Sequence, residues 1–273
     1  MRTLQGHGLP YLPPGQIDET LWVYDLRVRL SGRVRRLRFR RSGDVLKAEA
    51  DAALGKRDLA EAQRLTRRVF RLDDDLSPFY AMLDDGDELA WVKRGAGRLI
   101  ASPTVFEDTV KTICTTNCTW AGTKRMIGAL VELGEGAFPS PERLAATRER
   151  WFTEVGRMGY RGPYVKAIAR EVAGGELDLE ALLPQSGRGE ADVEKGLLAL
   201  PGVGPYAAAH IMQLLGYHHR FILDSATRPR FLALTNKKRA SDAAIRKRFA
   251  RYGRYAGLAF WLFVSKEWFE PES

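Results

Sequence analysis

The chain has 273 residues and a mass of 30.7 kDa, and 45% of its residues are hydrophobic. This length allows one large domain or two small ones with a buried core. No apolar run reaches the roughly eighteen residues that cross a bilayer, so we expect no membrane partner. Lys and Arg number 43 against 34 Asp and Glu, which gives a net charge of +9. A basic surface favours polyanions such as nucleic acids.

Cys114 and Cys118 are the cysteines of the sequence. Two thiolates cannot supply the cysteine ligand set of an iron–sulfur cluster, so we expect none. Their spacing within a helical-looking stretch predicts that both lie on one side of a helix as small hydrophobes. A role for a thiol is the alternative.

The N-terminal part of the chain has the period-two pattern of strands. Residues 21–30 end in an alternation of apolar residues with arginines, which predicts a strand with one buried face. Ser31-Gly32 predicts a turn, and further strands are expected around Leu37 and over residues 45–50. We interpret the arginines as the solvated face of a sheet, and a DNA-binding patch is the alternative.

Helical signals dominate the remainder. Ser-Pro pairs, which combine an N-cap residue with proline at the first helical position, mark helix starts at Ser77, Ser102 and Ser140. Predicted helices cover residues 51–71, 103–116, 118–133, 147–155, 163–173, 192–200, 206–215, 241–252 and 255–269. The expected fold is therefore mainly α, with a small N-terminal antiparallel β-sheet domain (α+β overall). We place that domain at residues 1–98 and the helical body at 99–273.

The most informative segment is residues 198–230, in which a tight turn connects two helices. Gly202 and Gly204 permit unusual dihedral angles and leave the backbone bare, and Pro205 suits the start of the second helix. Backbone N–H groups at such a helix start favour an anion such as a DNA phosphate. A plain connection without a ligand is the alternative for the two glycines alone.

The wider run LPGVGPYAAAHI, over residues 200–211, together with the later Asp224, resembles a known family signature. It is similar to the helix–hairpin–helix, Gly/Pro-rich, Asp superfamily of DNA glycosylases, which includes 3-methyladenine DNA glycosylase II and 8-oxoguanine DNA glycosylases. The resemblance covers roughly residues 103–269. It implies that Asp224 is the catalytic carboxylate, whereas the alternative is an N-cap for the helix containing Ser225 and Ala226.

Other segments match the same superfamily. Asn117 resembles the wedge that fills the hole left by a flipped base, and Gly159-Tyr160-Arg161 resembles a turn whose Tyr enters the stack and whose Arg contacts the orphaned base. Tyr255-Ala256-Gly257 resembles part of the last helix. The resemblance implies a set of DNA-binding residues: Asn117, Tyr160, Arg161, Gly202, Val203, Gly204 and Tyr206.

The chemistry that the resemblance implies is hydrolysis of an N-glycosidic bond after base flipping. Bifunctional relatives carry a Schiff-base lysine where this chain has Tyr206, so we expect a monofunctional enzyme without AP lyase activity. Lys111 or Lys124 is the alternative source of an amine. By alignment on Tyr255-Ala256-Gly257, Phe260 replaces a base-reading Gln.

We expect Tyr206, Phe260 and Trp120 to line the base pocket, with Trp261 and Phe263 as further candidates. Such a pocket favours an alkylated purine, with an oxidised purine next. The carbonyls of Leu198, Leu200 and Val203 match a site for Na⁺ or K⁺, and no cofactor is required. The expected partner is double-stranded DNA with a damaged base, bound by a monomer in the cytoplasm at the nucleoid.

Other functions fit parts of this pattern. The alternatives are a bifunctional 8-oxoguanine glycosylase/AP lyase, a mismatch glycosylase, and a helix–hairpin–helix module that binds DNA without catalysis.

Overall fold

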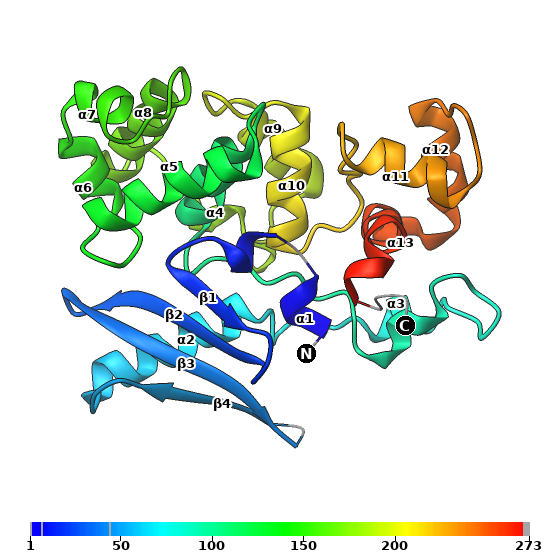
Figure 1. The fold of residues 1–273 in the computed structure, drawn as a ribbon, viewed down its shortest axis with the longest axis horizontal. Coiled ribbons are helices and arrows are strands. Elements are labelled where there is room, and N and C mark those ends of the chain that lie inside the picture. Colours follow the sequence, from blue (N-terminus) through cyan, green and yellow to red (C-terminus); the bar gives the residue numbers. More distant parts are fainter. Residues whose placement is uncertain (1, 7, 44, 270–273) are drawn as a thin grey trace.

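The computed structural model describes residues 2–6, 8–43 and 45–269 (Figure 1). Within them, an antiparallel sheet has the strand order β1-β2-β3-β4. Its strands are β1 (Gly15–Asp18), β2 (Val23–Leu30), β3 (Arg33–Ser42) and β4 (Val45–Ala50). The strands β2, β3 and β4 confirm the predicted ones. Strand β1 was not predicted, because four residues are too few to display an alternation.

Strands β2 and β3 form the expected hairpin. Leu30 pairs with Arg33, and Ser31 and Gly32 form the turn with φ angles of 42° and 79°. Leu26, Val28 and Leu30 are buried, as the alternation predicts. They pack against helix α2 (Lys56–Val69), so one helix covers the apolar face of the sheet.

Arginines on the sheet are paired with acids on neighbouring strands. Arg38 donates to both carboxylate oxygens of Asp25, at 2.8 and 2.7 Å, and Arg40 pairs with Glu49. The hydrogen bonds from Arg38 lower the pKa of Asp25. This pairing agrees with the interpretation of the arginines as a solvated face.

Helices form most of the remaining structure. The α-helices besides α2 are α1 (Arg2–Gln5), α3 (Ser77–Tyr80), α4 (Val105–Thr115), α5 (Trp120–Leu133), α6 (Pro141–Ala146), α7 (Glu149–Glu154), α8 (Arg161–Gly174), α9 (Glu190–Leu198), α10 (Pro205–Leu215), α11 (Thr227–Leu234), α12 (Asp242–Phe249) and α13 (Ala256–Phe269). The 3₁₀ helices are η1 (Leu9–Tyr11), η2 (Ala90–Arg94), η3 (Glu180–Leu182), η4 (Pro184–Ser186) and η5 (Ala250–Tyr255). The mainly helical fold with a small antiparallel sheet is therefore confirmed. In the described part of the chain, no helix combines the length and the apolar character needed to cross a membrane.

Most helix starts lie close to their predicted positions. Ser140 caps α6 by accepting a hydrogen bond from the Arg143 N–H, as expected. Helix α4 begins later than predicted, because the side chain of Thr104, and not that of Ser102, accepts the bond from the Glu107 N–H. A helix after Asp224 was expected only in the alternative that makes Asp224 an N-cap, and α11 begins at Thr227, after Ser225 and Ala226.

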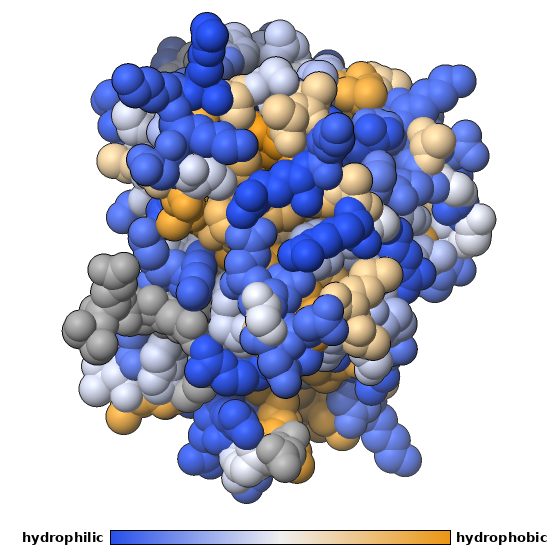
Figure 2. Space-filling model, turned by 90° about the vertical axis from the view of Figure 1, so that its right-hand side faces the viewer, coloured by the Kyte–Doolittle hydropathy of each residue, from blue (hydrophilic) through white to orange (hydrophobic). Residues whose placement is uncertain are grey.

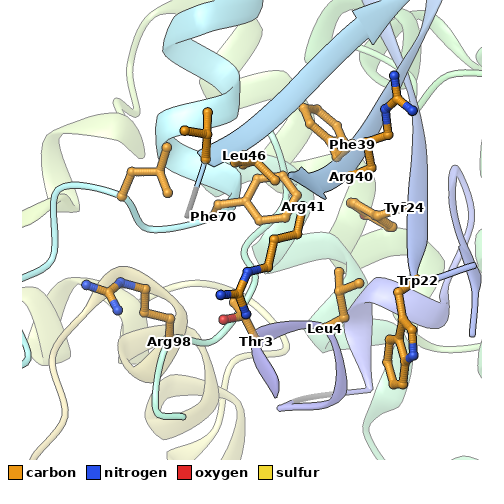
Figure 3. A pocket seen from close by; sticks show the side chains of 12 residues that line it. Thr3, Leu4, Trp22, Tyr24, Phe39, Arg40, Arg41, Leu46, Phe70 and Arg98 are labelled. Carbon is orange, nitrogen blue, oxygen red and sulfur yellow. The ribbon is translucent and has the colours of Figure 1, made fainter. Parts of the chain in front are cut away.

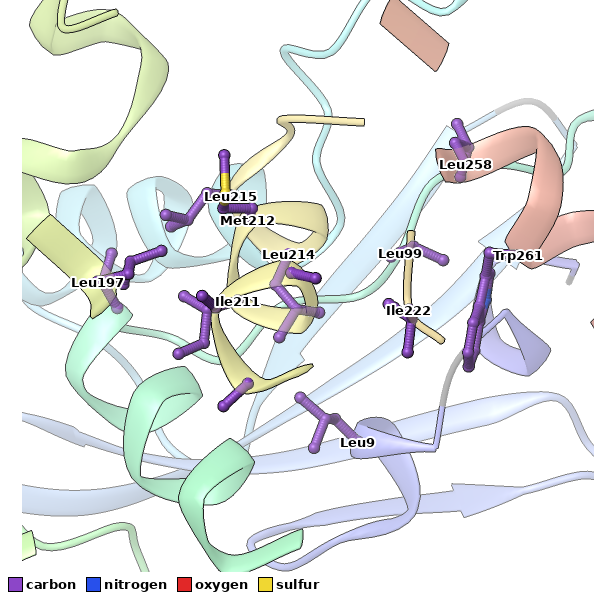
Figure 4. Packing of buried hydrophobic residues seen from close by; sticks show 14 of the residues in the cluster. Leu9, Leu99, Leu197, Ile211, Met212, Leu214, Leu215, Ile222, Leu258 and Trp261 are labelled. Atoms are coloured by element: carbon purple, nitrogen blue, oxygen red, sulfur yellow. The ribbon is translucent and has the colours of Figure 1, made fainter. Parts of the chain in front are cut away.

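Two buried hydrophobic clusters divide the molecule. The smaller joins the sheet to α2, and the larger fills the helical body. Figure 4 shows Leu9 and Leu99 beside Ile211 and Leu214 of α10 in the larger cluster. Leu9 therefore packs with the helical body although it precedes the predicted boundary at residue 98, and that boundary stays a prediction.

A buried ion pair connects the two clusters. Arg68 on α2 contacts Asp108 on α4 at 2.8 Å, and the other oxygen of Asp108 accepts the Ser102 N–H at 2.7 Å. Burial raises the pKa of Asp108 to about 6, against the opposing charge of Arg68. The pair fixes α4, whose last turn leads into the loop of Asn117.

Candidate active site

The predicted hairpin consists of α9, a turn over residues 199–204, and α10. Gly202 has a φ of 80°, and a Cβ at this position would lie 2.5 Å from the ring of Tyr164, so both dihedral angles and space require glycine. The Val203 N–H donates to the Leu200 carbonyl at 3.1 Å, which closes the turn. Gly204 is extended, and a Cβ there would have no neighbouring atom within 4 Å, and Pro205 begins α10. The N-terminus of α10 is thus bare backbone, while its contact with DNA stays a prediction.

Asp224 lies directly before α11 and is partly exposed. Its Oδ1 accepts hydrogen bonds from the Ala226 N–H at 2.9 Å, the Thr227 N–H at 2.7 Å and the Thr227 hydroxyl at 2.9 Å. The alternative of an N-cap therefore describes this oxygen correctly. No hydrogen bond engages Oδ2 among the described residues, so the same carboxylate holds α11 with one oxygen and presents the other.

An aromatic group lies next to Asp224. Tyr206 and His210 are one turn apart on α10, with ring centroids 5.6 Å apart, and His210 lies 6.1 Å from Trp261 of α13. Burial and the negative charge of Asp224 raise the pKa of Tyr206, which a hydrogen bond with the side chain of Thr115 partly offsets. Sequence reasoning missed His210, although its spacing of four residues from Tyr206 is the available signal.

His210 is neutral at pH 7 in this setting. Burial lowers its pKa to about 4, although the nearby charge of Asp224 acts in the opposite direction. A neutral imidazole beside Asp224 adds a polar side chain to the aromatic group without a positive charge that would pair with the carboxylate.

The N-terminal segment forms part of the same region. The indole N–H of Trp261 donates to the Gly6 carbonyl at 2.8 Å. A Cβ on Gly8 would lie 3.1 Å from the ring of Trp120, whose side chain is 43% exposed. Trp120 and Trp261 thus flank the chain at Gly6 and Gly8.

Phe260 does not lie in this group, contrary to the expectation that it lines the base pocket. Its side chain has no exposed surface and packs against Phe221, Phe231 and Phe249. One residue along a helix turns the side chain by about 100°, so Trp261 faces His210 while Phe260 faces the core. Phe263 packs on Phe249 in the same core.

Asn117, Tyr160 and Arg161 come together, as the resemblance implies. Asn117 is exposed and has a φ of 44°, and its amide donates to the Tyr160 hydroxyl at 3.4 Å, which lowers the pKa of that hydroxyl. Tyr160 is 52% exposed. Arg161, in contrast, is 7% exposed and donates to backbone carbonyls, so it is not directed outward as an arm that contacts a base would be.

The two lysines that could replace a Schiff-base lysine differ in their surroundings. Lys111 is buried, and its Nζ lies 2.7 Å from Glu107. Lys124 is exposed on α5. An amine that is buried and paired with a carboxylate is a poor nucleophile, which leaves Lys124 as the accessible candidate.

The cysteines do not share a helix side, which corrects that prediction. Cys114 is buried in α4, whereas Cys118 is exposed in the loop before α5, because α4 ends at Thr115. Burial raises the pKa of Cys114. No group of three or more His, Cys, Asp and Glu side chains that could hold a metal ion occurs among the described residues.

Two hollows in the surface are lined by residues other than Asp224. One of about 270 Å³ lies at the sheet, where Figure 3 shows Tyr24, Phe39 and Phe70 beside Arg41 and Arg98. The other, of about 600 Å³, is lined by residues including His219, Phe221 and Arg246. Neither contains a residue of the predicted site.

The side of the molecule that carries α11, α12 and α13 is largely hydrophilic (Figure 2). Exposed basic residues in and before α12 include Lys237, Lys238, Arg239, Arg246 and Lys247. Part of the net positive charge is therefore concentrated on the C-terminal helices.

Comparisons with known proteins agree with this architecture. No family model matches the chain. A DNA-3-methyladenine glycosylase of Bacillus subtilis (strain 168) is 28% identical over 168 residues, or 57% of this chain and 54% of the relative. The chain thus spans about half the length of the curated relative that it matches.

Solved structures match over a greater length. A 3-methyladenine DNA glycosylase from Archaeoglobus fulgidus has a TM-score of 0.72 at 20% identity, covering 96% of this chain and 92% of that one. An 8-oxoguanine glycosylase/lyase from Clostridium acetobutylicum, in complex with double-stranded DNA, has a TM-score of 0.70 at 20% identity over 96% and 92%. At this level of identity the likeness shows the fold.

Proposed function

We propose, from the premise that this chain belongs to the helix–hairpin–helix superfamily of DNA glycosylases, that it removes a damaged base from double-stranded DNA. The observation that carries the proposal is the setting of Asp224. Its Oδ1 accepts hydrogen bonds from α11, while Oδ2 accepts no hydrogen bond among the described residues. Tyr206 and His210 lie close enough to Asp224 for its negative charge to act on their pKa values.

The proposed reaction is hydrolysis of the N-glycosidic bond. As the base leaves, positive charge develops on the sugar, and the carboxylate of Asp224 stabilises that charge and orients the attacking water. The bare N-terminus of α10 and the turn at Gly202 hold a phosphate of the same strand. The base leaves the stack beforehand, because its sugar cannot be reached within the duplex.

We propose further that the enzyme is monofunctional. Tyr206 stands where bifunctional relatives carry their lysine, and a phenol cannot form a Schiff base with the sugar. The burial of Lys111 and its ion pair with Glu107 support this reading. Lys124 is the residue to replace if strand cleavage is nevertheless observed.

For the substrate, we propose an alkylated purine, with an oxidised purine as the second choice. Tyr206, His210, Trp261 and Trp120 give the region an aromatic character. Aromatic faces bind electron-poor alkylated bases by stacking and by cation–π attraction. The burial of Phe260 removes one residue from the predicted pocket, and Trp261 and His210 are themselves only 6% and 7% exposed. Trp120 and the partly buried Tyr206 are therefore the accessible aromatic residues of the proposal.

A monovalent cation at the hairpin is also a proposal. The carbonyl oxygens of Leu198 and Val203 accept no backbone hydrogen bond within the described part of the chain, and Leu200 accepts one. Carbonyl oxygens of this kind suit Na⁺ or K⁺, so the donor set fits. The ion would add positive charge where a phosphate binds.

We propose that the protein acts as a monomer at the nucleoid in the cytoplasm.

The test uses excess protein with labelled duplexes that each carry one lesion: a methylated or etheno purine, hypoxanthine, 8-oxoguanine, uracil or a G·T mismatch. Each reaction is divided and analysed with and without hot alkali, beside Asp224→Asn. Cleavage of an alkylated purine only after alkali, and not by the variant, is the expected result. Cleavage without alkali supports a lyase, and binding without any cleavage supports a module that only binds DNA.

A further inference from the structure

The loop between α4 and α5 is held in an unusual conformation. Asn117 has a φ of 44°, in the left-handed region, which Asn adopts more readily than most residues with a Cβ but less readily than glycine. The residue is also exposed. Contacts to its backbone carbonyls would keep this loop in a single conformation.

Arg161 supplies these contacts from the start of α8. Its Nε donates to the Thr116 carbonyl at 3.1 Å, and its Nη2 donates to the Thr116 carbonyl and, at 3.1 Å, to the Asn117 carbonyl. Its Nη1 donates to the Met158 carbonyl of its own turn at 3.5 Å. All three nitrogens of the guanidinium are therefore engaged by backbone.

The same guanidinium also fixes Tyr160. Its carbon lies 4.5 Å from the centroid of the Tyr160 ring, while the Tyr160 hydroxyl accepts a hydrogen bond from the Asn117 amide at 3.4 Å. The adjacent Gly162 lies close to α7, because a Cβ there would be 2.7 Å from the Cβ of Phe152. The start of α8 is thus packed tightly against α7.

We propose that Arg161 is a positioning residue that holds Asn117 and Tyr160 as one preformed wedge, and that it does not read the orphaned base. The term wedge rests on the proposed function, but the holding of the loop does not. A preformed wedge enters the gap left by a flipped base without a further loss of conformational entropy.

The first test concerns the free protein and needs no activity. Backbone ¹⁵N relaxation of Asn117 is measured in the wild type, Arg161→Ala, Arg161→Lys and Arg170→Ala. Arg170 is an exposed residue of the same helix, so its replacement controls for charge. We expect an order parameter near 0.85 in the wild type and Arg170→Ala, and below about 0.6 in Arg161→Ala.

Arg161→Lys is expected to resemble Arg161→Ala, since an ammonium cannot fork across two carbonyls. Arg161→Lys keeps the positive charge, so it serves as a second, folded variant if Arg161→Ala is unstable. An unchanged order parameter of Asn117 in both variants overturns the proposal.

The second test uses single-turnover excision from duplexes with each of the four bases opposite the lesion. If Arg161 positions the wedge, Arg161→Ala lowers the rate by a similar factor in all four, on the order of 10- to 100-fold. A loss confined to one opposing base means that Arg161 reads the orphaned base, and it overturns the proposal.

Asn117→Gly provides the matching background. Glycine adopts the left-handed conformation without strain, so the loop keeps its shape while the amide is lost. In the Asn117→Gly background, Arg161→Ala is then expected to lower the excision rate by a smaller factor than it does in the wild type. An equal factor in both backgrounds would contradict the proposal that Arg161 acts through Asn117. If the wild type removes no base, the proposed function fails while the relaxation measurement still decides the role of Arg161.

Discussion

Two aspartates, at the start of α4 and before α11, occupy opposite environments in the same molecule. Asp108 is fully buried and uses both carboxylate oxygens, one for Arg68 and one for the Ser102 N–H. Asp224 is partly exposed and uses Oδ1 alone, for the backbone and hydroxyl groups of α11. A carboxylate with both oxygens engaged serves the structure, whereas one with an unengaged oxygen remains available for chemistry.

The comparison separates stability from activity. Replacement of Asp108 should act on folding, and replacement of Asp224 should act on the reaction.

The largest effect is expected for Asp224→Asn. The variant should lower single-turnover excision by about 10³-fold or more, because the amide cannot stabilise positive charge on the sugar. The free energy of unfolding should change by less than about 1 kcal/mol, since the amide oxygen still accepts from α11. Excision within tenfold of wild type would rule out Asp224 as the catalytic carboxylate.

Asp108→Asn should have the opposite effect, with a large loss of stability and little change in excision. It leaves Arg68 buried without a counter-charge, which costs roughly 3–5 kcal/mol of unfolding free energy in urea titrations. Excision per folded molecule should stay near wild type. Arg68→Met combined with Asp108→Asn should recover most of the loss, and a further loss in the double variant would contradict the pairing.

The pH dependence of stability reports on the histidine beside Asp224. Burial lowers the pKa of His210 to about 4 and that of His218 to about 3, below the unfolded value near 6.5. At these two histidines the unfolded state therefore binds more protons between those values, so their contribution to stability is complete above pH 6.5 and is lost as the pH falls. Asp108, whose pKa is raised to about 6, contributes in the opposite direction. For His210 the loss is on the order of 3 kcal/mol by pH 4, and in His210→Phe the decline measured in urea should be shallower.

The smallest effects are expected on the sheet. Arg38→Ala removes an exposed pair with Asp25 and should change the unfolding free energy by less than about 1 kcal/mol. Arg36→Ala with Arg38→Ala should leave the salt dependence of duplex binding unchanged, if these arginines are a solvated face. A slope that falls by about one or two units would instead place a phosphate contact there.

Local patterns in the sequence predicted much of the fold. The alternation around Leu26, the Ser31-Gly32 turn and the cap at Ser140 are set by neighbouring residues, and all three are present. Strand β1 was not predicted because its four residues are too few to display an alternation, although its partner β2 follows directly in the sequence. Helix α11 was expected only as a helix that Asp224 would cap, without bounds, and it packs against α13, which is distant in the sequence.

The candidate site divides in the same way. The glycines of the hairpin and the position of Asp224 follow from a continuous motif, so the sequence determined that a bare helix N-terminus and an aspartate before a helix would occur. The directions of Phe260 and Trp261, the inclusion of His210 and the inward turn of Arg161 were decided by the tertiary structure. A motif specifies backbone and spacing, whereas the direction in which a side chain points depends on helices packed from elsewhere in the chain.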